Sequence, residues 1–134
     1  MSLEIQQRER EGILILDLSG RITVGEEASR LRESLRELAA AGKTRIILNL
    51  EQVDYIDSTG LGALVVGYTS LRKAGGMLKL ANLSRRNIEL LIFTKLETVF
   101  EIFDSELDAV NSFFPGRTAR RFDILSFVQQ QSQR

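Results

Sequence analysis

The sequence predicts an α/β fold, a single domain in which a mixed sheet of about five strands packs against about four helices, with a helical extension at the C-terminus. Short apolar runs of strand length alternate with segments whose apolar residues recur at helical spacing. The β-branched and leucine-rich run from Arg45 to Leu50 lies between two such segments, which implies a parallel strand pair with a right-handed crossover. The 134 residues are enough for one domain with a buried core.

The first third of the chain predicts two strands and a helix. Strands are expected at Leu3 to Gln7 and at Ile13 to Leu18, with a hairpin turn formed by the charged residues 8–12 between them. The run from Thr23 to Glu26 has the spacing of a capping box, and Gly42 is a ready C-cap. The helix between them is expected to bury Ala28, Leu31, Leu35 and Leu38.

The middle of the chain predicts the most regular part of the fold. The strand at Arg45 to Leu50 is followed by a helix from Ser58 to about Ala74, which Gly75 and Gly76 end. Ser58 falls at the predicted N-cap, where its hydroxyl can accept a hydrogen bond from the first turn. The helix is expected to turn one stripe toward the core, formed by Leu61, Leu64, Val65, Tyr68 and Leu71.

The last third predicts two more strands and three helical segments. Strands are expected at Met77 to Ala81 and Thr98 to Phe103. The expected helices begin after Asn82 to Ser84, after Asp104 to Glu106, and near Arg117. We divide the chain into a domain at residues 1–115 and an extension at 116–134, which is expected to be helical to about Gln130 and to fray from Gln129 to Arg134. The apolar stripe of the extension must be covered, either by its own domain or by a partner or second copy.

Composition excludes several classes of function. The chain has 18 basic and 18 acidic residues, so we expect no nucleic-acid-binding patch, and the basic runs Arg85–Arg86 and Arg117 to Arg121 are interpreted as solvated helix ends. There is no cysteine and no histidine, which removes thiol nucleophiles, imidazole bases and the usual nitrogen or sulfur metal ligands. The polar start of the chain is unlike a signal peptide, and no apolar run approaches the roughly 18 residues of a membrane span. We expect a cytoplasmic protein without a cofactor.

The hexapeptide from Asp57 to Gly62 is the main candidate site, and its residues allow three interpretations. Ser58 could be only a helix cap, with Gly60 and Gly62 serving tight packing. The turn could bind a phosphate, although Val65 stands where a dinucleotide fingerprint needs its third glycine. Alternatively, Ser58 is itself phosphorylated, because a helix N-terminus tolerates a phosphoserine dianion.

The outward face of the same helix suits close contact with another protein. Its predicted residues are small and partly apolar: Thr59, Gly62, Ala63, Val66, Thr69 and Ser70. A dianion on Ser58 beside Asp57 would oppose docking of an acidic or apolar surface. Val66 could equally be a single exposed valine. A catalytic role for Ser58 is disfavoured because no histidine can act as its base. We interpret Glu51, Asp54 and Asp57 as solvated acidic residues rather than as the ligands of a metal ion.

These motifs together resemble the STAS domains of bacterial anti-sigma-factor antagonists. The resemblance rests on Leu48-Asn49-Leu50, on Ile56 to Gly62, on Gly75–Gly76 before a strand, and on the early run Leu18 to Ile22. It covers roughly residues 3 to 112. It implies a STAS-like fold, and a regulatory protein that is not an enzyme.

The resemblance also implies roles for single residues and partners. Ser58 would be the phosphorylation site, with Thr59 as a possible second acceptor, and the partner-binding residues would be Asp57, Ser58, Thr59, Gly60, Gly62 and Val66. The unmodified form would bind an anti-sigma factor that is also a serine kinase and so release the sigma factor, while a phosphatase would restore it after phosphorylation. ATP and magnesium would belong to the kinase. We expect no nucleic-acid or membrane contact, and a monomer or weak homodimer.

Two alternatives remain open at this point. A STAS subunit of a constitutive scaffold or transporter-associated complex would use the same surface for permanent contacts, with Ser58 serving only as a cap. A small nucleotide-binding enzyme would instead use the glycine-rich turn, against the missing third glycine.

Overall fold

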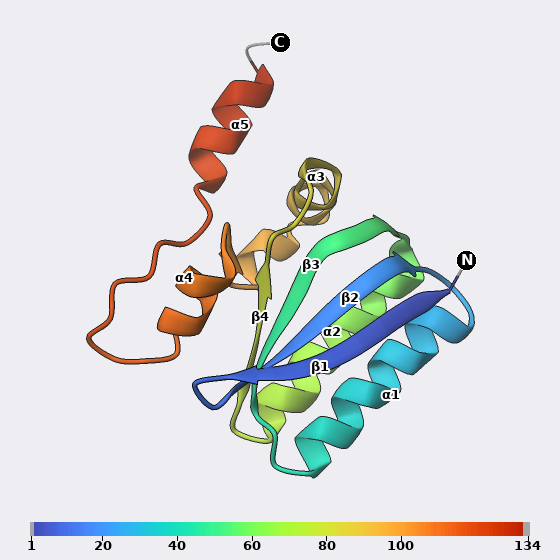
Figure 1. Cartoon of the computed structure of the whole chain (residues 1–134). Helices are drawn as coiled ribbons and strands as arrows, with labels where there is room; N and C mark the ends of the chain where they lie inside the picture. The colour runs from blue at the N-terminus through green and yellow to red at the C-terminus, as the bar shows by residue number, and fades with distance from the viewer. Residues whose placement is uncertain (1, 133–134) are drawn as a thin grey trace.

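A computed structural model describes residues 2–132 and confirms the mixed sheet with helices on it (Figure 1). The strands are β1 (Leu3–Arg10), β2 (Ile13–Ile22), β3 (Arg45–Ile56), β4 (Met77–Ala81) and β5 (Ile102–Phe103). The α-helices are α1 (Glu26–Ala40), α2 (Ser58–Lys73), α3 (Arg85–Phe93), α4 (Glu106–Asn111) and α5 (Ile124–Ser132), with a 3-10 helix at Leu96–Thr98. No helix in this part of the chain is long and apolar enough to cross a bilayer.

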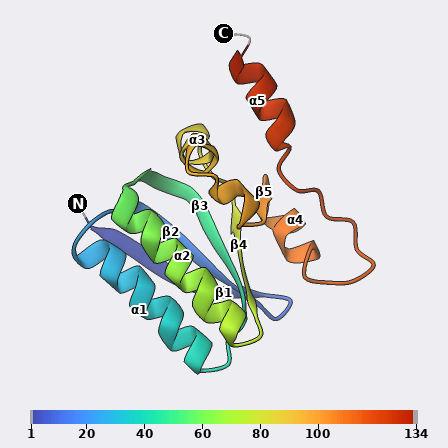
Figure 2. The ribbon, with the colours of Figure 1, turned by 180° about the vertical axis from the view of Figure 1, so that it is seen from behind.

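The strands lie side by side in chain order, β1-β2-β3-β4-β5. The β1–β2 hairpin is antiparallel, and every later neighbouring pair is parallel. Helices α1 and α2 lie together against one face of the sheet, as Figure 2 shows from behind. The carboxyl ends of β2 and β3 therefore meet beside the start of α2, where the loops that follow parallel strands gather.

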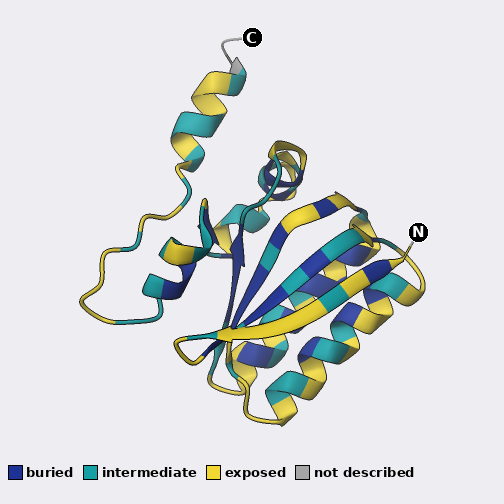
Figure 3. Cartoon of the chain, viewed as in Figure 1, coloured by how far each residue is buried: buried dark blue, intermediate teal, exposed yellow. Residues whose placement is uncertain are grey.

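The two faces of the sheet carry separate apolar clusters, and Figure 3 shows consecutive buried residues along β4 and the first half of β3. The larger cluster lies under α1 and α2 and includes the predicted stripe residues Leu31, Leu35, Leu61, Leu64 and Leu71. The smaller one joins β2, β3, β4 and β5 to α4, and consists of Ile13, Ile15, Ile47, Ala81, Phe103, Ala109 and Val110. Since consecutive strand residues point to opposite faces, β2 and β3 can serve both clusters.

The ends of the strands differ from the sequence prediction. The hairpin turn is only Glu11 and Gly12, both with positive φ (52° and 82°), so β1 runs on through Arg10. Two residues with positive φ form the turn type whose twist matches a hairpin. The prediction of a last strand from Thr98 to Phe103 is wrong over most of that length. The chain instead forms a 3-10 helix at Leu96–Thr98 and pairs with β4 only at Ile102–Phe103.

The two predicted ends of α1 have different outcomes. The capping box is not formed: the N-cap is Gly25, and no side chain caps the helix. The reason is tertiary, because the backbone N–H of Val24 is held by a carboxylate from a distant part of the chain. At the other end Gly42 adopts φ 81°, and Lys43 N–H donates to Leu38 O at 2.9 Å, which confirms the glycine stop.

The C-terminal extension is less helical than predicted. Helix α5 begins at Ile124, seven residues after the predicted start, and continues to Ser132, beyond the point where fraying was expected. Residues 133 and 134 lie outside the described residues. Phe122 and Ile124 pack against the main core, but Leu125 is 69% exposed, so the domain covers only part of the apolar stripe. The division at residue 115 stays a prediction.

Candidate functional site

The candidate site lies where β3 ends and α2 begins. Asp57, not Ser58, is the N-cap of α2: its backbone is extended (φ −94°, ψ −177°), and its side chain accepts a hydrogen bond from Gly60 N–H. The predicted N-cap was therefore one residue too late. Both residue types cap helices well, and the position of β3 decides between them, because Asp57 N–H donates to Ile22 O on β2.

The Asp57 carboxylate ties the start of α2 to the loop between β2 and α1. Its Oδ1 accepts from Gly60 N–H at 2.8 Å, and its Oδ2 accepts from Val24 N–H at 2.8 Å. Burial alone would raise the pKa of this carboxyl, but hydrogen bonds from the N–H groups of Gly60, Val24 and Thr59 favour the charged form and leave the pKa below its ordinary value. The Asp57 carboxylate is thus ionised at neutral pH, and both of its oxygens accept backbone hydrogen bonds.

Ser58 and Thr59 are the first two residues of α2, and both are exposed. Within residues 2–132, neither hydroxyl makes a hydrogen bond. Since Asp57 supplies the cap, the hydroxyl of Ser58 has no structural task in the helix. It is free to react or to contact another molecule.

Gly60 faces the interior of the protein. It is buried, and a Cβ added to it would lie 1.9 Å from Ile22 O and 2.7 Å from Ile22 C. The prediction that Gly60 keeps the helix start open to a partner is therefore wrong. The residue has no side chain because the end of β2 lies directly against the helix.

The outward face of α2 is narrower than predicted but otherwise agrees with the sequence. Ala63 is fully buried, so it does not belong to this face. Gly62 is exposed, and an added Cβ there would meet no described atom within 4 Å beyond its chain neighbours and the adjacent backbone of its own helix. Val66, one turn further on, is 38% exposed. Thr59, Gly62 and Val66 thus form one smooth strip beside Ser58.

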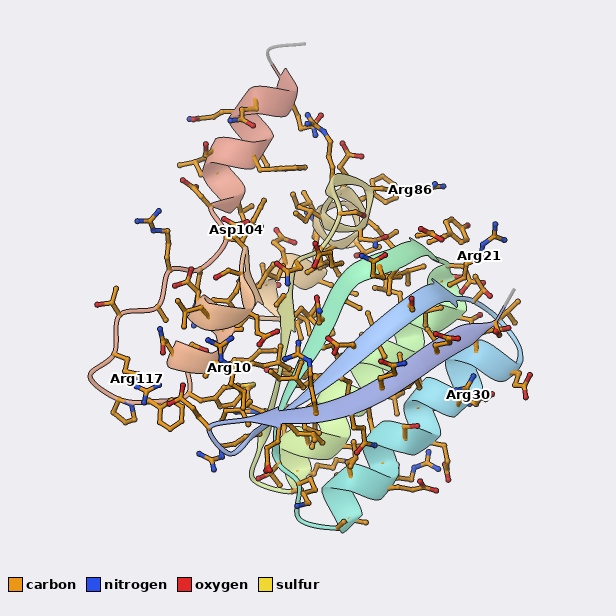
Figure 4. All side chains as sticks on the ribbon, viewed as in Figure 1. Arg10, Arg21, Arg30, Arg86, Asp104 and Arg117 are labelled. Carbon is orange, nitrogen blue, oxygen red and sulfur yellow. The ribbon has the colours of Figure 1, made fainter. Side chains whose placement is uncertain are left out.

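A cleft that the sequence did not predict opens on the other side of Ser58. It has a volume of about 520 Å³ and lies between the end of β3 and α3. Its residues are Tyr55, Ile56, Asp57, Ser58, Arg86, Asn87, Glu89, Leu90 and Phe93. Phe93 is 87% exposed, and the Arg86 guanidinium lies 4.8 Å from the centre of the Tyr55 ring. Figure 4 shows Arg86 reaching from α3 toward the corner of the molecule where Arg21 lies.

Sequence reasoning missed this cleft because it depends on how α3 docks. The sequence offered two signals: the aromatic residue Phe93 at the end of α3, and the pair Arg85–Arg86, which we interpreted as a solvated helix end. No group of three or more acidic side chains in the described part of the chain is arranged to hold a metal ion. Glu51, Asp54 and Asp57 form no such group in the described residues.

Comparison with known proteins gives results that agree with this architecture. The model of the STAS domain family matches residues 4–109. The chain is 38% identical over 102 residues to the anti-sigma-B factor antagonist of Bacillus subtilis strain 168, a match that covers 76% of this chain and 92% of that protein.

Solved structures share the fold. A putative anti-sigma factor antagonist from Thermotoga maritima superposes with a TM-score of 0.76 at 23% identity, over 81% of this chain and 92% of that one. The Bacillus cell fate determinant SpoIIAA, solved in its phosphorylated form, superposes with a TM-score of 0.65 at 20% identity, over 83% of this chain and the whole of the other.

Proposed function

Because this chain belongs to the STAS domain family, we propose that it is an anti-sigma factor antagonist controlled by phosphorylation of Ser58. In its unmodified form it binds an anti-sigma factor with serine kinase activity, and the sigma factor is released. Phosphorylation ends the binding, and a phosphatase restores it. The 38% identity to an anti-sigma-B factor antagonist along most of both chains supports the antagonist role.

The observation that carries the switch is the free hydroxyl of Ser58. It is exposed, and it makes no hydrogen bond within residues 2–132, because the neighbouring Asp57 caps the helix. A modification at Ser58 therefore breaks no described contact of the fold. Thr59 is equally exposed and stays the second candidate acceptor.

The covalent step is a phosphoryl transfer supplied by the partner. The Ser58 Oγ forms a bond to the γ-phosphorus of ATP, and the bond from that phosphorus to the oxygen bridging the β- and γ-phosphates breaks. ADP leaves, and the hydroxyl proton passes to a base of the kinase. ATP and magnesium are bound by the kinase, so the chain itself needs no cofactor and catalyses nothing.

The phosphate acts on docking and leaves the fold intact. At the first residue of α2 the dianion lies at the positive end of the helix dipole, an interaction worth about 0.3–1 kcal/mol. The strip of Thr59, Gly62 and Val66 lies next to it and is smooth enough for close approach of a partner. A dianion at the edge of such a contact, beside the charged Asp57, opposes an acidic or apolar partner surface.

The remaining parts of the proposal concern setting and assembly. We place the protein in the cytoplasm, where sigma factors and ATP are found, and we propose a monomer or weak homodimer with no contact to nucleic acid or membrane. The balance of 18 basic and 18 acidic residues is consistent with this.

Binding to the kinase-type anti-sigma factor of the same host tests the switch. We expect Ser58→Asp to weaken the complex at least about tenfold in calorimetry, and Ser58→Ala to bind like the unmodified protein even after incubation with ATP and magnesium. Thr59→Ala tests the second candidate acceptor, and intact mass should show one added phosphate that Ser58→Ala prevents and Thr59→Ala does not. Equal binding by Ser58→Asp and the unmodified protein would contradict the switch and favour a permanent scaffold contact.

A further inference from the structure

The cleft beside Ser58 contains a cation to which partner binding gives no role. Arg86 and Ser58 both line it, one from α3 and the other from the start of α2. We propose that Arg86 receives the phosphoryl group on Ser58, so that the phosphate is held on the surface of this chain. The inference rests on the proposed phosphorylation, but it concerns a contact within the modified chain and can be tested without any partner.

The position of Arg86 is fixed by the way α3 begins. Ser84 caps the helix by accepting a hydrogen bond from Asn87 N–H at 3.2 Å. Asn87 is 1% exposed, and its side-chain amide donates to Val53 O on β3 at 3.3 Å. This buried contact locks the first turn of α3 onto the last residues of β3, and Arg86 is the residue immediately before it.

Stacking on Tyr55 brings the guanidinium of Arg86 toward the end of β3. The guanidinium carbon lies 4.8 Å from the centre of the Tyr55 ring, three residues before Ser58 in the chain. This cation–π contact uses no hydrogen bond of the guanidinium, and the described residues offer its N–H groups no acceptor. The edge N–H groups are the donors that match a phosphate geometrically.

Arg86 has no competing anion. Within the described residues it makes no hydrogen bond and no ion pair, whereas the adjacent Arg85 pairs with Glu89 at 3.9 Å. The two carboxylates that line the cleft are already occupied: Asp57 accepts from two backbone N–H groups, and Glu89 accepts from Gln131 at 2.7 Å besides its pairing with Arg85. A phosphate on Ser58 would therefore be a new anion for an arginine without a partner.

A second arginine, Arg21, lies beside the same tyrosine on the neighbouring strand. Arg21 on β2 is paired in register with Tyr55 on β3, so the two side chains lie on the same face of the sheet. Its side chain likewise makes no hydrogen bond or ion pair in the described chain. Arg21 does not line the cleft, and its influence on the phosphate should be weaker than that of Arg86.

The test uses the full chain with phosphoserine incorporated genetically at position 58. The pH dependence of its ³¹P signal reports the second pKa of the phosphate, which is about 6 when unperturbed. A neighbouring cation favours the dianion, so we expect Arg86→Ala to raise this pKa by roughly half a unit relative to the unsubstituted phosphoprotein. The helix N-terminus acts on the phosphate in every variant, and the difference therefore isolates Arg86.

Three further variants sharpen the measurement. Arg86→Gln keeps a polar side chain with N–H donors but removes the charge, and it should give the same phosphate pKa as Arg86→Ala. Arg86→Lys should keep at least half of the effect on the phosphate pKa because it keeps the charge. Arg36→Ala is the control for net charge: Arg36 pairs with Glu33 on α1, and its removal should leave the phosphate pKa unchanged. Arg21→Ala should raise the phosphate pKa by more than Arg36→Ala does and by less than Arg86→Ala does.

An unchanged phosphate pKa in both Arg86→Ala and Arg86→Gln would overturn the inference, as would a shift of the same size in Arg36→Ala. Neither outcome would contradict the proposed function, because that function is tested by binding to the partner. Conversely, if Ser58→Asp bound the anti-sigma factor normally, the switch would fail, while the contact between Arg86 and an incorporated phosphoserine could still be measured.

Discussion

The inner and outer sides of the first turn of α2 have opposite properties, although their residues alternate within one short motif. On the inner side, Asp57 and Gly60 are committed to the fold: one caps the helix and holds Val24, and the other lies against Ile22 O. On the outer side, Ser58 and Gly62 have no described partner. Neighbouring residues of a single motif can thus serve folding and function separately.

The contrast between the two sides explains why the proposed phosphorylation of Ser58 would leave the fold intact. The contacts described for the first turn of α2 are made by the inner residues Asp57 and Gly60, so a group added to Ser58 on the outer side breaks none of them. The following predictions test this division, from the largest expected effect to the smallest.

Gly60→Ala should be the most damaging small substitution in the site. Its Cβ would lie 1.9 Å from Ile22 O, a backbone atom that cannot move without distorting β2. We expect a loss of about 3 kcal/mol or more in the free energy of unfolding, at the upper end of overpacking effects. Urea denaturation measures it, and a loss below about 1 kcal/mol would show that the inner side is not fixed.

Asp57→Ala should cost about 1–2 kcal/mol of unfolding free energy, because it removes a helix cap and the tie to Val24 N–H. Asp57→Asn is the matched variant. Asparagine caps helices as well as aspartate does, but its amide group cannot accept from Val24 and Gly60 with both ends. Because the cap is kept, Asp57→Asn should lose less unfolding free energy than Asp57→Ala. Equal losses in the two variants would mean that the carboxylate matters only through its charge.

Gly62→Ala should act in the opposite direction on stability. Beyond its chain neighbours and the adjacent backbone of its own helix, no described atom lies within 4 Å of the added Cβ. Alanine also stabilises a helix relative to glycine by up to about 1 kcal/mol. We expect a gain of roughly 0.5–1 kcal/mol in unfolding free energy together with weaker binding to the anti-sigma factor. If the variant were more stable and bound the anti-sigma factor unchanged, Gly62 would not belong to the surface that contacts the partner.

The pH dependence of stability should show the smallest effect. The folded-state pKa of Asp57 is lowered, so its contribution to stability is present above the unfolded pKa of about 3.9 and is lost as the pH falls through the folded value. Asp17 and Glu106 act in the same direction, because hydrogen bonds from Arg8 lower their pKa values against the opposing effect of burial.

Asp57→Asn should therefore lose less stability than the unsubstituted protein between about pH 5 and pH 3. The difference should stay below about 1 kcal/mol, since Asp57 is only partly buried. Urea unfolding at several pH values measures it. A steeper acid loss in Asp57→Asn would contradict the assigned direction of the pKa shift.

The sequence predicts the elements of this fold well because their signals are local. Periodicity placed the end of α2 within one residue and both ends of β4 correctly. The predicted function also began with a local signal, the motif from Asp57 to Gly62. What remained ambiguous was the use of each residue, since both Asp57 and Ser58 are good helix caps.

The features that sequence reasoning missed all depend on contacts between distant segments. Gly60 serves Ile22, which is 38 residues earlier, and Asp57 holds Val24, 33 residues earlier. Arg86 reaches the site only because Asn87 docks α3 on Val53. Such pairs leave no periodic trace in one sequence. A helix-end arginine looks the same whether it faces solvent or a serine across a cleft.

The order of the strands has a consequence for how the chain folds during synthesis. Each strand of β1-β2-β3-β4-β5 pairs with the strand that precedes it, so no later strand inserts between two earlier ones. The sheet can grow at one edge in the order in which the ribosome delivers it. Ser58 emerges on a helix whose sheet neighbours β2 and β3 are already complete, whereas the Arg86 wall of the cleft arrives later. A nascent chain would thus present the serine before it presents the arginine.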